Sequence, residues 1–346
     1  MGAHKQECGR MFENLTYEVA KHLEGKNIFL TGASGFIGGW FIDFFSYLNE
    51  NVLKTPCRVL CTEHHSEVKK TEMITSIKLD LTEQFSEKVE GCDFHYIIHA
   101  AGIASPQQYS RYPVETLDLS YLGTKNVLEM ARHHPVESIL CFSSAAVYGT
   151  PGPENTPTSE EYIGLVSSLS DRSSYAIGKK VLETLCYVYQ NKYELPIKIV
   201  RPFNIYGPRM DKNNVIGKFI DKIMTNQPIV IYGDGMQTRT FCHIIDAING
   251  FMRALLLGDT GEAYNIGSQK AEISIFDLAK LLFKVSERPY MLGSDIKLVE
   301  YPKNYPKNEP RRSAPNMTKA NERIGYYGIH TLENGLSSLC ANLQEN

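Results

Sequence analysis

The amino-acid sequence predicts an α/β protein in which helices cover both faces of a doubly wound parallel sheet, joined to a smaller C-terminal α/β domain that binds the substrate. Three observations support this prediction. Short apolar segments alternate with helix-like segments in the first half of the chain, a pattern typical of a parallel sheet. A glycine triplet follows the first apolar segment. After residue 204, Gly and Pro separate much shorter segments.

The expected elements follow one another in a regular order. Phe12, Leu15, Val19 and Leu23 recur at helical spacing and predict a short amphipathic helix before the sheet. Six apolar segments are expected to form strands: 26–31, 58–62, 74–79, 94–100, 137–143 and 196–202. Three segments between them are expected to form helices: 36–48, 114–132 and 175–193.

The change in character at residue 204 suggests two domains. The first is expected to cover residues 1–203, with about 241–267 returning to it, and the second to cover 204–240 and 268–346. The helix over 175–193 carries apolar residues on more than one side. It therefore packs either on the sheet and a partner subunit, or on the sheet alone through a wide apolar stripe.

The composition argues against several functional classes. The 346 residues carry a net charge of −3 and are 42% hydrophobic, so nothing suggests a nucleic-acid partner. No run of about 18 apolar residues is present, which argues against a membrane partner, and the N-terminus lacks the apolar core of a signal peptide. The eight cysteines are scattered without the spacing of a zinc site. This predicts reduced thiols, no metal and a cytoplasmic protein.

A phosphate-binding loop is expected between the first strand and the first helix, at Thr31-Gly-Ala-Ser-Gly-Phe-Ile-Gly38. Glycines at 32, 35 and 38 would let the backbone turn tightly, approach a pyrophosphate and pack closely on the helix, whose N-terminus attracts phosphate. The spacing is G-x-x-G-x-x-G rather than the commoner G-x-G-x-x-G. With a strand before it and a helix after it, the loop predicts a Rossmann-type dinucleotide site.

Glu63 ends the second expected strand, where an acid would bind the adenosine ribose of a dinucleotide. A carboxylate there repels a 2′-phosphate, so it favours NAD. Four basic side chains follow closely and could reverse this preference, which keeps NADP as an alternative: His64, His65, Lys69 and Lys70. Asp80 follows the third strand and either contacts the adenine or forms a surface turn.

The segment Tyr175-Ala-Ile-Gly-Lys179 has the pattern Y-x-x-x-K. Residues four apart on a helix lie one above the other, so the pattern predicts an ammonium group beside a phenol. A nearby lysine and an oxidised nicotinamide both favour the phenolate, which would make Tyr175 a base near neutral pH. Tyr121 and Lys125 have the same spacing, but they lie within a helix before the fifth strand. Tyr175 follows that strand and the pair of serines at 143 and 144.

Together these motifs resemble the extended short-chain dehydrogenase/reductase family, whose NAD-dependent epimerases and dehydratases act on nucleotide sugars. The resemblance extends over about residues 26–335. Seven motifs carry it: TGASGFIG, HAAG at 99–102, SSAAVYG, YAIGK, RPFNIYGPR at 201–209, GDGMQTRTF at 233–241 and PRRSAPNMTKA at 310–320. Two of them, PFNIYGPRM and GDGMQTRTF, look most like the UDP-glucuronate decarboxylase branch, and sugar 4-epimerases are the other near branch.

The resemblance implies a catalytic set of Ser144, Tyr175 and Lys179. Ser144 would hydrogen-bond the sugar oxygen being oxidised, Tyr175 would take its proton, and Lys179 would hold the nicotinamide ribose and tune Tyr175. Ser143 would then be structural. The implied cofactor is NAD, held by the glycine loop and the strand ends: Gly32, Gly35, Phe36, Ile37, Gly38, Glu63, Asp80, Leu81, Ala100, Ala101, Gly102, Tyr175, Lys179 and Pro202.

The resemblance also implies a nucleoside-diphosphate sugar as substrate. Four side chains are the implied contacts: Asn204, Lys218, Arg239 and Arg312. Guanidinium groups suit phosphate oxygens, although both arginines could instead be solvated surface residues. Arg311 competes with Arg312 for the same role, and base contacts are implied in the 214–219 region.

Two alanines, Ala145 and Ala146, separate the possible reactions. Dehydratases of the family carry Asp-Glu directly after the catalytic hydroxyl residue, and UDP-glucuronate decarboxylases carry Ser-Glu. Methyl groups cannot transfer protons, so a 4,6-dehydratase or a decarboxylase is less expected here. A sugar-nucleotide 4-epimerase needs only Ser, Tyr, Lys and the nicotinamide, and it is the favoured prediction. An NAD(P)H-dependent 4-keto-sugar reductase needs the same groups and is the alternative.

Ser120 is a further departure, because the family usually has asparagine three residues before the Gly-Thr at 123–124. A dinucleotide-binding sensor or scaffold without turnover is the non-enzyme alternative, and such proteins usually lack the Tyr-Lys pair. The family commonly forms homodimers through the helices that correspond to 114–132 and 175–193. A homodimer is therefore the expected assembly.

Overall fold

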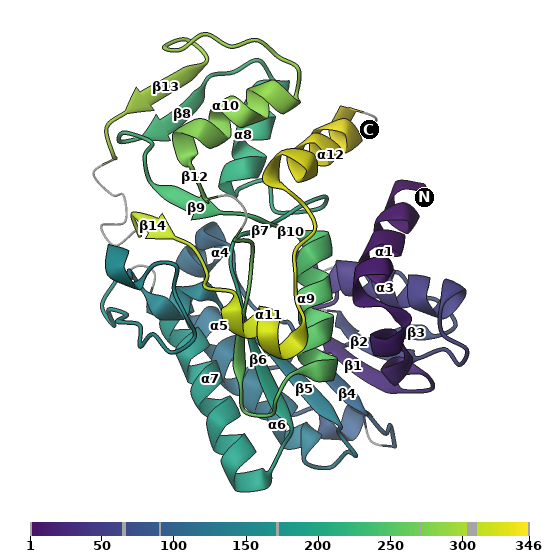
Figure 1. Ribbon diagram of the computed structural model, residues 1–346. Helices are drawn as coiled ribbons and strands as arrows, with labels where there is room; N and C mark the ends of the chain where they lie inside the picture. The colour runs from purple at the N-terminus through teal and green to yellow at the C-terminus, as the bar shows by residue number, and fades with distance from the viewer. Residues whose placement is uncertain are drawn as a thin grey trace.

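The computed structural model describes residues 2–63, 67–89, 91–170, 173–269, 272–302 and 310–344. Its centre is a seven-stranded sheet in the order β11-β6-β5-β4-β1-β2-β3, and all neighbouring strands are parallel (Figure 1). The strands are β1 (Asn27–Thr31), β2 (Arg58–Glu63), β3 (Ile74–Lys78), β4 (Tyr96–His99), β5 (Ser138–Phe142), β6 (Ile197–Pro202) and β11 (Ala263–Ile266). This is a doubly wound order, so the fold class predicted from the sequence is confirmed.

Helices cover both faces of this sheet. Two main helices pack on each face: α3 (Phe36–Asn51) and α9 (Ile244–Leu257) on one, and α6 (Thr124–Ala131) and α7 (Ser173–Tyr193) on the other. Along β1, Ile28 joins the first of these cores and Phe29 joins the second. Consecutive side chains of a strand point to opposite faces, which is why a strand covered on both faces is apolar throughout.

The expected strands lie within two residues of their predicted bounds, but the helix expected over 114–132 is interrupted. It consists of α5 (Pro113–Asp118), a π-helical turn η3 (Leu119–Gly123) and α6. A π-helical turn accommodates an extra residue in a helix and often occurs at functional sites. Here it carries Ser120, whose hydroxyl donates a hydrogen bond to the carbonyl of Thr116 (2.7 Å) and packs closely against Gly178 of α7.

A smaller α/β portion lies over the carboxyl ends of the parallel strands (Figure 1). Its strands pair in three small sheets: β7 (Ile205–Tyr206) with β10 (Cys242–His243), β8 (Ile229–Tyr232) with β13 (Ile296–Val299), and β9 (Thr238–Thr240) with β12 (Glu272–Ser274) and β14 (Arg312–Ser313). Three helices share its core: α8 (Val215–Met224), α10 (Ile275–Val285) and α12 (Leu332–Gln344). The domain boundaries predicted from the sequence stay a prediction. In the segment expected to return to the first domain, α9 packs against the large sheet and β11 pairs with β6 of that sheet.

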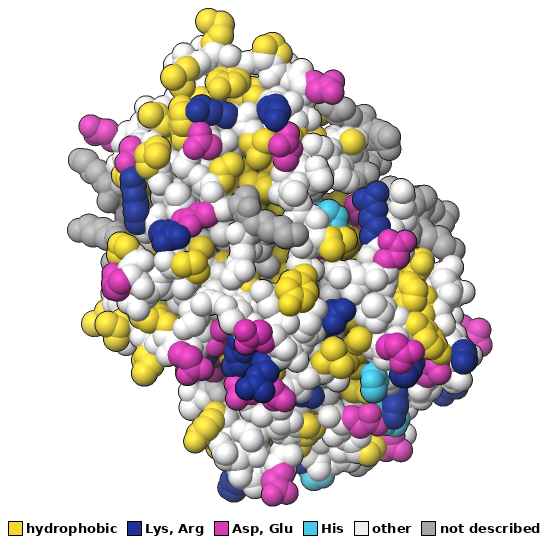
Figure 2. All heavy atoms as spheres, viewed as in Figure 1, with side chains coloured by type: hydrophobic (Ala, Val, Ile, Leu, Met, Phe, Trp, Pro, Cys, Tyr) yellow, Lys and Arg dark blue, Asp and Glu magenta, His cyan; other side chains and the backbone are white. Residues whose placement is uncertain are grey.

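Short helices connect several of these elements: α4 (Pro106–Arg111), α11 (Thr318–Ile324), η2 (Ser86–Val89), η4 (Ala145–Tyr148) and η5 (Pro153–Asn155). On the face shown in Figure 2, acidic and basic side chains are interspersed, and hydrophobic side chains gather over the smaller portion. Within the described part of the chain, no helix combines the length and the apolarity needed to cross a membrane.

The N-terminal segment is packed into the fold rather than attached to its surface. α1 (Gly2–Leu15) lies against α3 and α9 (Figure 1) and buries Met11 and Leu15 completely. Arg253 of α9 donates a hydrogen bond to the carbonyl of Asn14 (2.8 Å), which satisfies one of the free carbonyls at the end of α1.

The single N-terminal helix predicted from the sequence is divided in the structure. Thr16 has a φ of 71°, and α2 (Tyr17–Ala20) and η1 (Lys21–Leu23) follow it. A β-branched residue in the left-handed region cannot continue a helix, so the chain changes direction at Thr16. The predicted apolar positions still face the core, since Leu15, Val19 and Leu23 are buried.

We expect the substitution Leu15→Ala to lower the free energy of unfolding by about 2–5 kcal/mol, because a fully buried leucine would leave a cavity between α1 and the helices beneath it. The neighbouring substitution Glu13→Ala, at an exposed position, should change it by less than about 0.5 kcal/mol. Urea denaturation followed by circular dichroism measures both values. Equal, small effects would mean that α1 does not contribute to the core.

Candidate active site

A cleft of about 1180 Å³ lies between the large sheet and the smaller portion. The segments that end β1, β4, β5 and β6 form one wall, and α8, β8 and β9 form the other. The chain leaves β1 and β4 toward opposite sides of the sheet, which opens a crevice at the carboxyl ends of these strands. Ligands of doubly wound sheets bind in this crevice.

The glycine loop occupies the bottom of the cleft, between β1 and α3. Gly32 has a φ of 73°, and a Cβ atom there would lie 2.7 Å from the backbone nitrogen of Ala101. A Cβ atom on Gly38 would lie 2.1 Å from the carbonyl oxygen of Gly32. The loop can therefore fold back this tightly only without side chains at these two positions, and it leaves the N-terminus of α3 open to a phosphate.

Most of the other predicted cofactor residues of α3 and the strand ends line the cleft, and the rest lie behind its wall. Five of them line the cleft beside the glycines: Phe36, Ile37, Ala100, Gly102 and Pro202. Ala101 lies behind this wall, and its backbone nitrogen donates a hydrogen bond to Oγ1 of Thr31 (3.2 Å). Leu81 is buried in the core on the α6 side. This arrangement fits a dinucleotide that lies across the carboxyl ends of β1 and β4.

The two acids predicted to meet the adenosine lie beyond the described lining of the cleft. Glu63 accepts a hydrogen bond from the backbone nitrogen of Val68 (3.2 Å) and lies 3.7 Å from Nζ of Lys70. Asp80 accepts hydrogen bonds from the backbone nitrogen and Oγ1 of Thr82, at 2.9 Å and 2.7 Å. Asp80 thus closes the turn after β3. His64 and His65, which could oppose NAD selectivity, are outside the described residues.

Ser144, Tyr175 and Lys179 are brought together by β5 and α7. Ser144 follows β5 and caps η4, because its Oγ accepts a hydrogen bond from the backbone nitrogen of Ala146 (3.2 Å). Ser144 and Tyr175 both line the cleft. Lys179 is buried one helical turn after Tyr175, and its Nζ donates a hydrogen bond to the carbonyl of Phe142 (2.6 Å).

The ammonium of Lys179 lies near the ring of Tyr175, as the Y-x-x-x-K spacing predicts, but its hydrogen bond goes to the backbone. Nζ of Lys179 lies 6.0 Å from the centre of the Tyr175 ring, because the carbonyl of Phe142 holds it. Burial raises the pKa of Tyr175 to about 12, and hydrogen bonding by Ser144 opposes this rise. Burial also lowers the pKa of Lys179 to about 8. The phenol is therefore neutral in the free protein, and it needs the positive charge of an oxidised nicotinamide to act as a base near neutral pH.

Tyr109 is a residue of the site that sequence reasoning missed. Its ring stacks on the ring of Tyr175, with centres 5.1 Å apart and planes 8° apart. Tyr109 is buried in the middle of α4, lines the cleft and adds to the rise in the pKa of Tyr175 that burial causes. Parallel stacking restrains the ring of Tyr175, so Tyr109 helps to aim the phenol. The segment 106–111 carries no motif that would have indicated this contact.

The cleft is neutral near Ser144 and charged toward the smaller portion. Ala145 and Ala146 line it directly after Ser144, and among the described lining residues from 100 to 176 none carries a formal charge. The charged side chains of the described lining come from later in the chain: Asp211, Lys218 and Arg239. Asp211 accepts hydrogen bonds from the backbone and side-chain nitrogens of Asn213, both at 2.9 Å.

Three of the four predicted substrate residues line the charged end: Asn204, Lys218 and Arg239. Asn204 adopts a φ of 37°, and its side-chain amide donates a hydrogen bond to the carbonyl of Thr240 (3.0 Å). This contact ties the segment after β6 to β9, which carries Arg239. The guanidinium of Arg239 donates a hydrogen bond to the carbonyl of Thr238 (2.7 Å).

The fourth residue, Arg312, is not among the described lining residues of the cleft. Its guanidinium forms two bonds with the carboxylate of Glu272, at 2.7 Å and 2.8 Å, and a third with the carbonyl of Thr156 (2.6 Å). Arg311 pairs with Asp234 at 2.9 Å and 2.5 Å. The neighbouring Ser313 does line the cleft. The structure thus gives the predicted phosphate contact of Arg312 no support, since the side chain joins β14 to β12.

Within the described ranges, no three His, Cys, Asp or Glu side chains gather as metal ligands would. The residues of the glycine loop do fit a dinucleotide, because the close backbone packing at Gly32 and Gly38 lets the loop turn back and leaves the N-terminus of α3 facing the cleft.

The comparisons with known proteins agree with this geometry. Residues 28–267 match the model of the NAD dependent epimerase/dehydratase family. UDP-glucuronic acid decarboxylase 6 of Arabidopsis thaliana is 33% identical over 319 residues, which cover 89% of this chain and 86% of that protein. UDP-glucuronic acid decarboxylase 1 of Xenopus tropicalis is 30% identical over 322 residues, which cover 90% and 70%. The structure of UDP-glucose 4-epimerase from Thermotoga maritima superposes with a TM-score of 0.80, at 24% identity, over 92% of this chain and 99% of that chain.

We expect Gly38→Ala to weaken NAD binding by about 10–100-fold, because the added methyl group would meet the carbonyl oxygen of Gly32 and displace the loop from the helix N-terminus. Gly39→Ala is the matched control, since the nearest atom to its Cβ would be Nη1 of Arg209 at 3.5 Å. Titration calorimetry with NAD measures both, on protein from which bound nucleotide has first been removed. Similar affinities for the two folded variants would contradict the assignment of the loop.

We also expect Ser144→Ala to move the acidic limb of the pH–rate profile to higher pH. Ser144 lowers the pKa of Tyr175, so its loss raises this pKa, and less phenolate is then present at any given pH. The maximal rate should fall about 10–100-fold with the loss of a hydrogen bond to a charged group. Tyr175→Phe is the control, since it removes the titrating phenol. An unmoved limb in Ser144→Ala would contradict the coupling between these two side chains.

Proposed function

Because the chain belongs to the NAD dependent epimerase/dehydratase family, and is thus an NAD-dependent enzyme of nucleotide-sugar modification, we propose that it is a sugar-nucleotide 4-epimerase. In this proposal the enzyme oxidises C4 of the sugar, lets the 4-keto sugar turn over in the cleft, and reduces it again on the opposite face. The sugar is neither dehydrated nor decarboxylated.

The observation that carries the proposal is the pair of methyl groups directly after Ser144. Elimination of water or loss of carbon dioxide requires groups that transfer protons or hold a carboxylate beside the oxidised carbon. Ala145 and Ala146 occupy that edge of the cleft and can do neither. Asp211 is the one carboxylate of the described lining, and Asn213 already donates two hydrogen bonds to it. These features support a reaction confined to hydride transfer at C4.

In the proposed mechanism each catalytic side chain has one role. Ser144 hydrogen-bonds the C4 oxygen, and the phenol of Tyr175 exchanges a proton with it at each transfer. Lys179 holds the ribose next to the nicotinamide and adds positive charge to the site. NAD, when bound over Gly32 and Gly38, supplies the hydride acceptor. The neutral alanine edge lets the keto sugar turn without a charged partner that would hold it in one orientation.

The charge distribution in the cleft supports one orientation of the substrate. Lys218 and Arg239 at the smaller portion suit the diphosphate, because cationic side chains stabilise phosphate oxygens. The neutral wall around Ser144 suits the sugar ring. The relatives named above act on UDP sugars, as their names state, so a UDP-sugar is the first substrate to test.

We propose a homodimer as the assembly. Large apolar side chains are exposed along α5, η3 and α7, among them Val114 (64%) and Tyr187 (68%). Contiguous exposed apolar surface of this kind commonly marks an interface. On α7, Leu182 and Cys186 are buried against the sheet, so this helix carries apolar residues on both of its sides.

We expect the purified protein to retain NAD through gel filtration and to interconvert the C4 epimers of at least one UDP-, dTDP-, GDP- or CDP-sugar without added cofactor. Tyr175→Phe should lower this rate by about 100-fold or more, because it removes the phenol that exchanges the proton with the C4 oxygen in this proposal. Proton NMR of the sugar products and absorbance of reduced nicotinamide measure both.

Two outcomes would contradict the proposal. A protein that binds no NAD and consumes added NADPH with a 4-keto sugar would be a ketoreductase. Release of carbon dioxide or of a 4-keto-6-deoxy product would identify a decarboxylase or a dehydratase. Unchanged activity in Tyr175→Phe would overturn the assignment of the base.

A further inference from the structure

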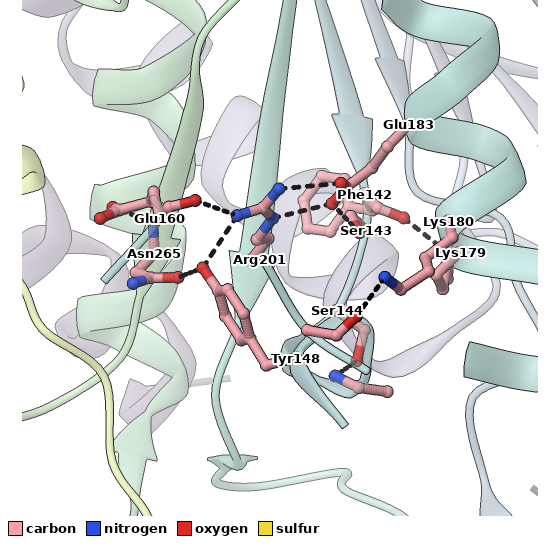
Figure 3. Close-up of polar contacts among 12 residues, drawn as sticks. Phe142, Ser143, Ser144, Tyr148, Glu160, Lys179, Lys180, Glu183, Arg201 and Asn265 are labelled. Carbon is pink, nitrogen blue, oxygen red and sulfur yellow. Dashed lines mark hydrogen bonds and ion pairs between the residues drawn. The ribbon is translucent and has the colours of Figure 1, made fainter. Parts of the chain in front are cut away.

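A largely buried ion pair lies behind the catalytic serine. Glu183 on α7 and Arg201 at the end of β6 form two bonds, Nε to Oε1 and Nη2 to Oε2, both 2.8 Å (Figure 3). Their side chains are only 17% and 13% exposed, and neither belongs to the described lining of the cleft. The desolvation of such a pair offsets much of its attraction, so its value lies in the fixed geometry of two parallel bonds.

The pair and Lys179 together hold the two residues that precede Ser144. Oγ of Ser143 donates a hydrogen bond to Oε1 of Glu183 (2.5 Å), and the carbonyl of Phe142 accepts one from Lys179 (2.6 Å) (Figure 3). Lys179 and Glu183 stand one turn apart on α7, the helix that also carries Tyr175. The end of β5 is therefore tied at two consecutive residues to the helix of the catalytic base.

Arg201 also holds the segment that follows Ser144. Its Nη1 donates hydrogen bonds to the hydroxyl of Tyr148 (3.0 Å) and to the carbonyl of Glu160 (3.1 Å). The Tyr148 hydroxyl in turn donates to Oδ1 of Asn265 in β11 (2.7 Å), and the backbone nitrogen of Asn265 donates to the Glu160 carboxylate (2.8 Å) (Figure 3). The chain from 142 to 148 is thus fixed on both sides of Ser144.

We propose that the Glu183–Arg201 pair is a positioning device for the redox reaction, which sets the place of Ser144 relative to Tyr175. This inference rests on the proposed function, because it concerns the same hydride-transfer site. Glu183 and Arg201 are positioning residues and touch no reacting atom. A displacement of about 1 Å between reacting groups can lower a rate by about 100-fold, so a contact behind the site can affect kcat strongly.

Glu183 has a second, electrostatic effect on Lys179. The titratable groups that face Lys179 come from three elements: His99 of β4, Cys141 of β5, and Tyr175, Glu183 and Cys186 of α7. Burial lowers the pKa of Lys179 to about 8, whereas Cys141, Cys186 and Glu183 oppose this change. Glu183 is the one carboxylate of the set. Without it the pKa of Lys179 falls further, and the lysine loses its charge at lower pH.

The variant Glu183→Gln tests the proposal, because it keeps the shape of the side chain and removes its charge. We expect kcat for hydride transfer to fall about 10–100-fold, KM for the nucleotide sugar to stay within about threefold, and NAD content to stay unchanged. The alkaline limb of the pH–rate profile, which reports the charge of Lys179, should move to lower pH. A purely structural role would not move this limb.

Asp246→Asn is the matched control. Asp246 is buried in α9, and its Oδ1 lies 2.9 Å from Nδ1 of His330, away from the described lining of the cleft. This variant should lower Tm at least as much as Glu183→Gln does, with kcat within about twofold of the wild type. A folded Glu183→Gln variant with wild-type kcat and an unmoved alkaline limb would overturn the proposal.

Ser143→Ala gives a second test that keeps the ion pair. We expect kcat to fall about 3–10-fold with no movement of the alkaline limb, because one hydrogen bond to the Glu183 carboxylate is lost while both charges of the ion pair remain. The ionisation of Tyr175 can be followed in the NAD-loaded protein by its tyrosinate absorbance, after the absorbance of the Tyr175→Phe variant is subtracted. In Ser143→Ala this titration should move to higher pH, because Ser144, which lowers the pKa of Tyr175, moves away from it. If Glu183→Gln does not fold, this variant decides, and an unchanged kcat and titration would overturn the positioning role.

These readouts separate the two proposals. Wild-type protein that turns over no nucleotide sugar would contradict the proposed function, whereas the tyrosinate titration of Ser143→Ala would still test the positioning role without turnover. Wild-type turnover together with unaffected Glu183→Gln and Ser143→Ala variants would contradict the positioning role alone.

Discussion

The contact between the ends of β1 and β4 joins the two strand ends from which the glycine loop and the segment 100–102 leave the sheet. Thr31 ends β1, and its Oγ1 lies 2.9 Å from Nδ1 of His99, which ends β4. Nε2 of His99 lies 3.1 Å from Oγ1 of Thr124 at the start of α6. Burial lowers the pKa of His99 to about 3, so the imidazole is neutral and bridges two hydroxyl groups without an unpaired charge. The glycine turn begins directly after Thr31, next to this bridge.

Because β5 lies beside β4, the bridge stands next to the strand that leads to Ser144. Ser144 follows β5, which β4 separates from β1 and the dinucleotide loop, and α7 brings Tyr175 and Lys179 to the same place. The reacting groups thus come from strand ends and a long helix, which are the rigid parts of the fold. The side chains proposed to bind the diphosphate, Lys218 and Arg239, come instead from the smaller portion, which lies across the cleft. In the proposed function, substrate recognition and hydride transfer are therefore carried by different parts of the chain.

Much of this arrangement could be predicted from the sequence, because it depends on local patterns. Strand–helix alternation predicted the sheet, and the glycine spacing predicted the loop that Gly32 and Gly38 form. Contacts between distant segments were not predictable in this way. The stacking of Tyr109 on Tyr175, the bond from Lys179 to Phe142 and the pairing of Arg312 with Glu272 each join residues that no motif connects. The turn at Thr16 was missed because the apolar spacing continues through it.

The way in which Ser144 is held also explains how the reaction can differ among related proteins without a change of fold. The bonds that fix this segment involve Phe142, Ser143 and Tyr148, on either side of the two alanines. Ala146 contributes a backbone nitrogen, which any residue other than proline could supply. The side chain at 146 can therefore change without loss of the bonds that hold Ser144, whereas Ala145 also packs against the buried cluster of Val147, Tyr148 and Phe203. Acidic groups at these positions would add proton transfer to the redox step, and methyl groups leave that step alone.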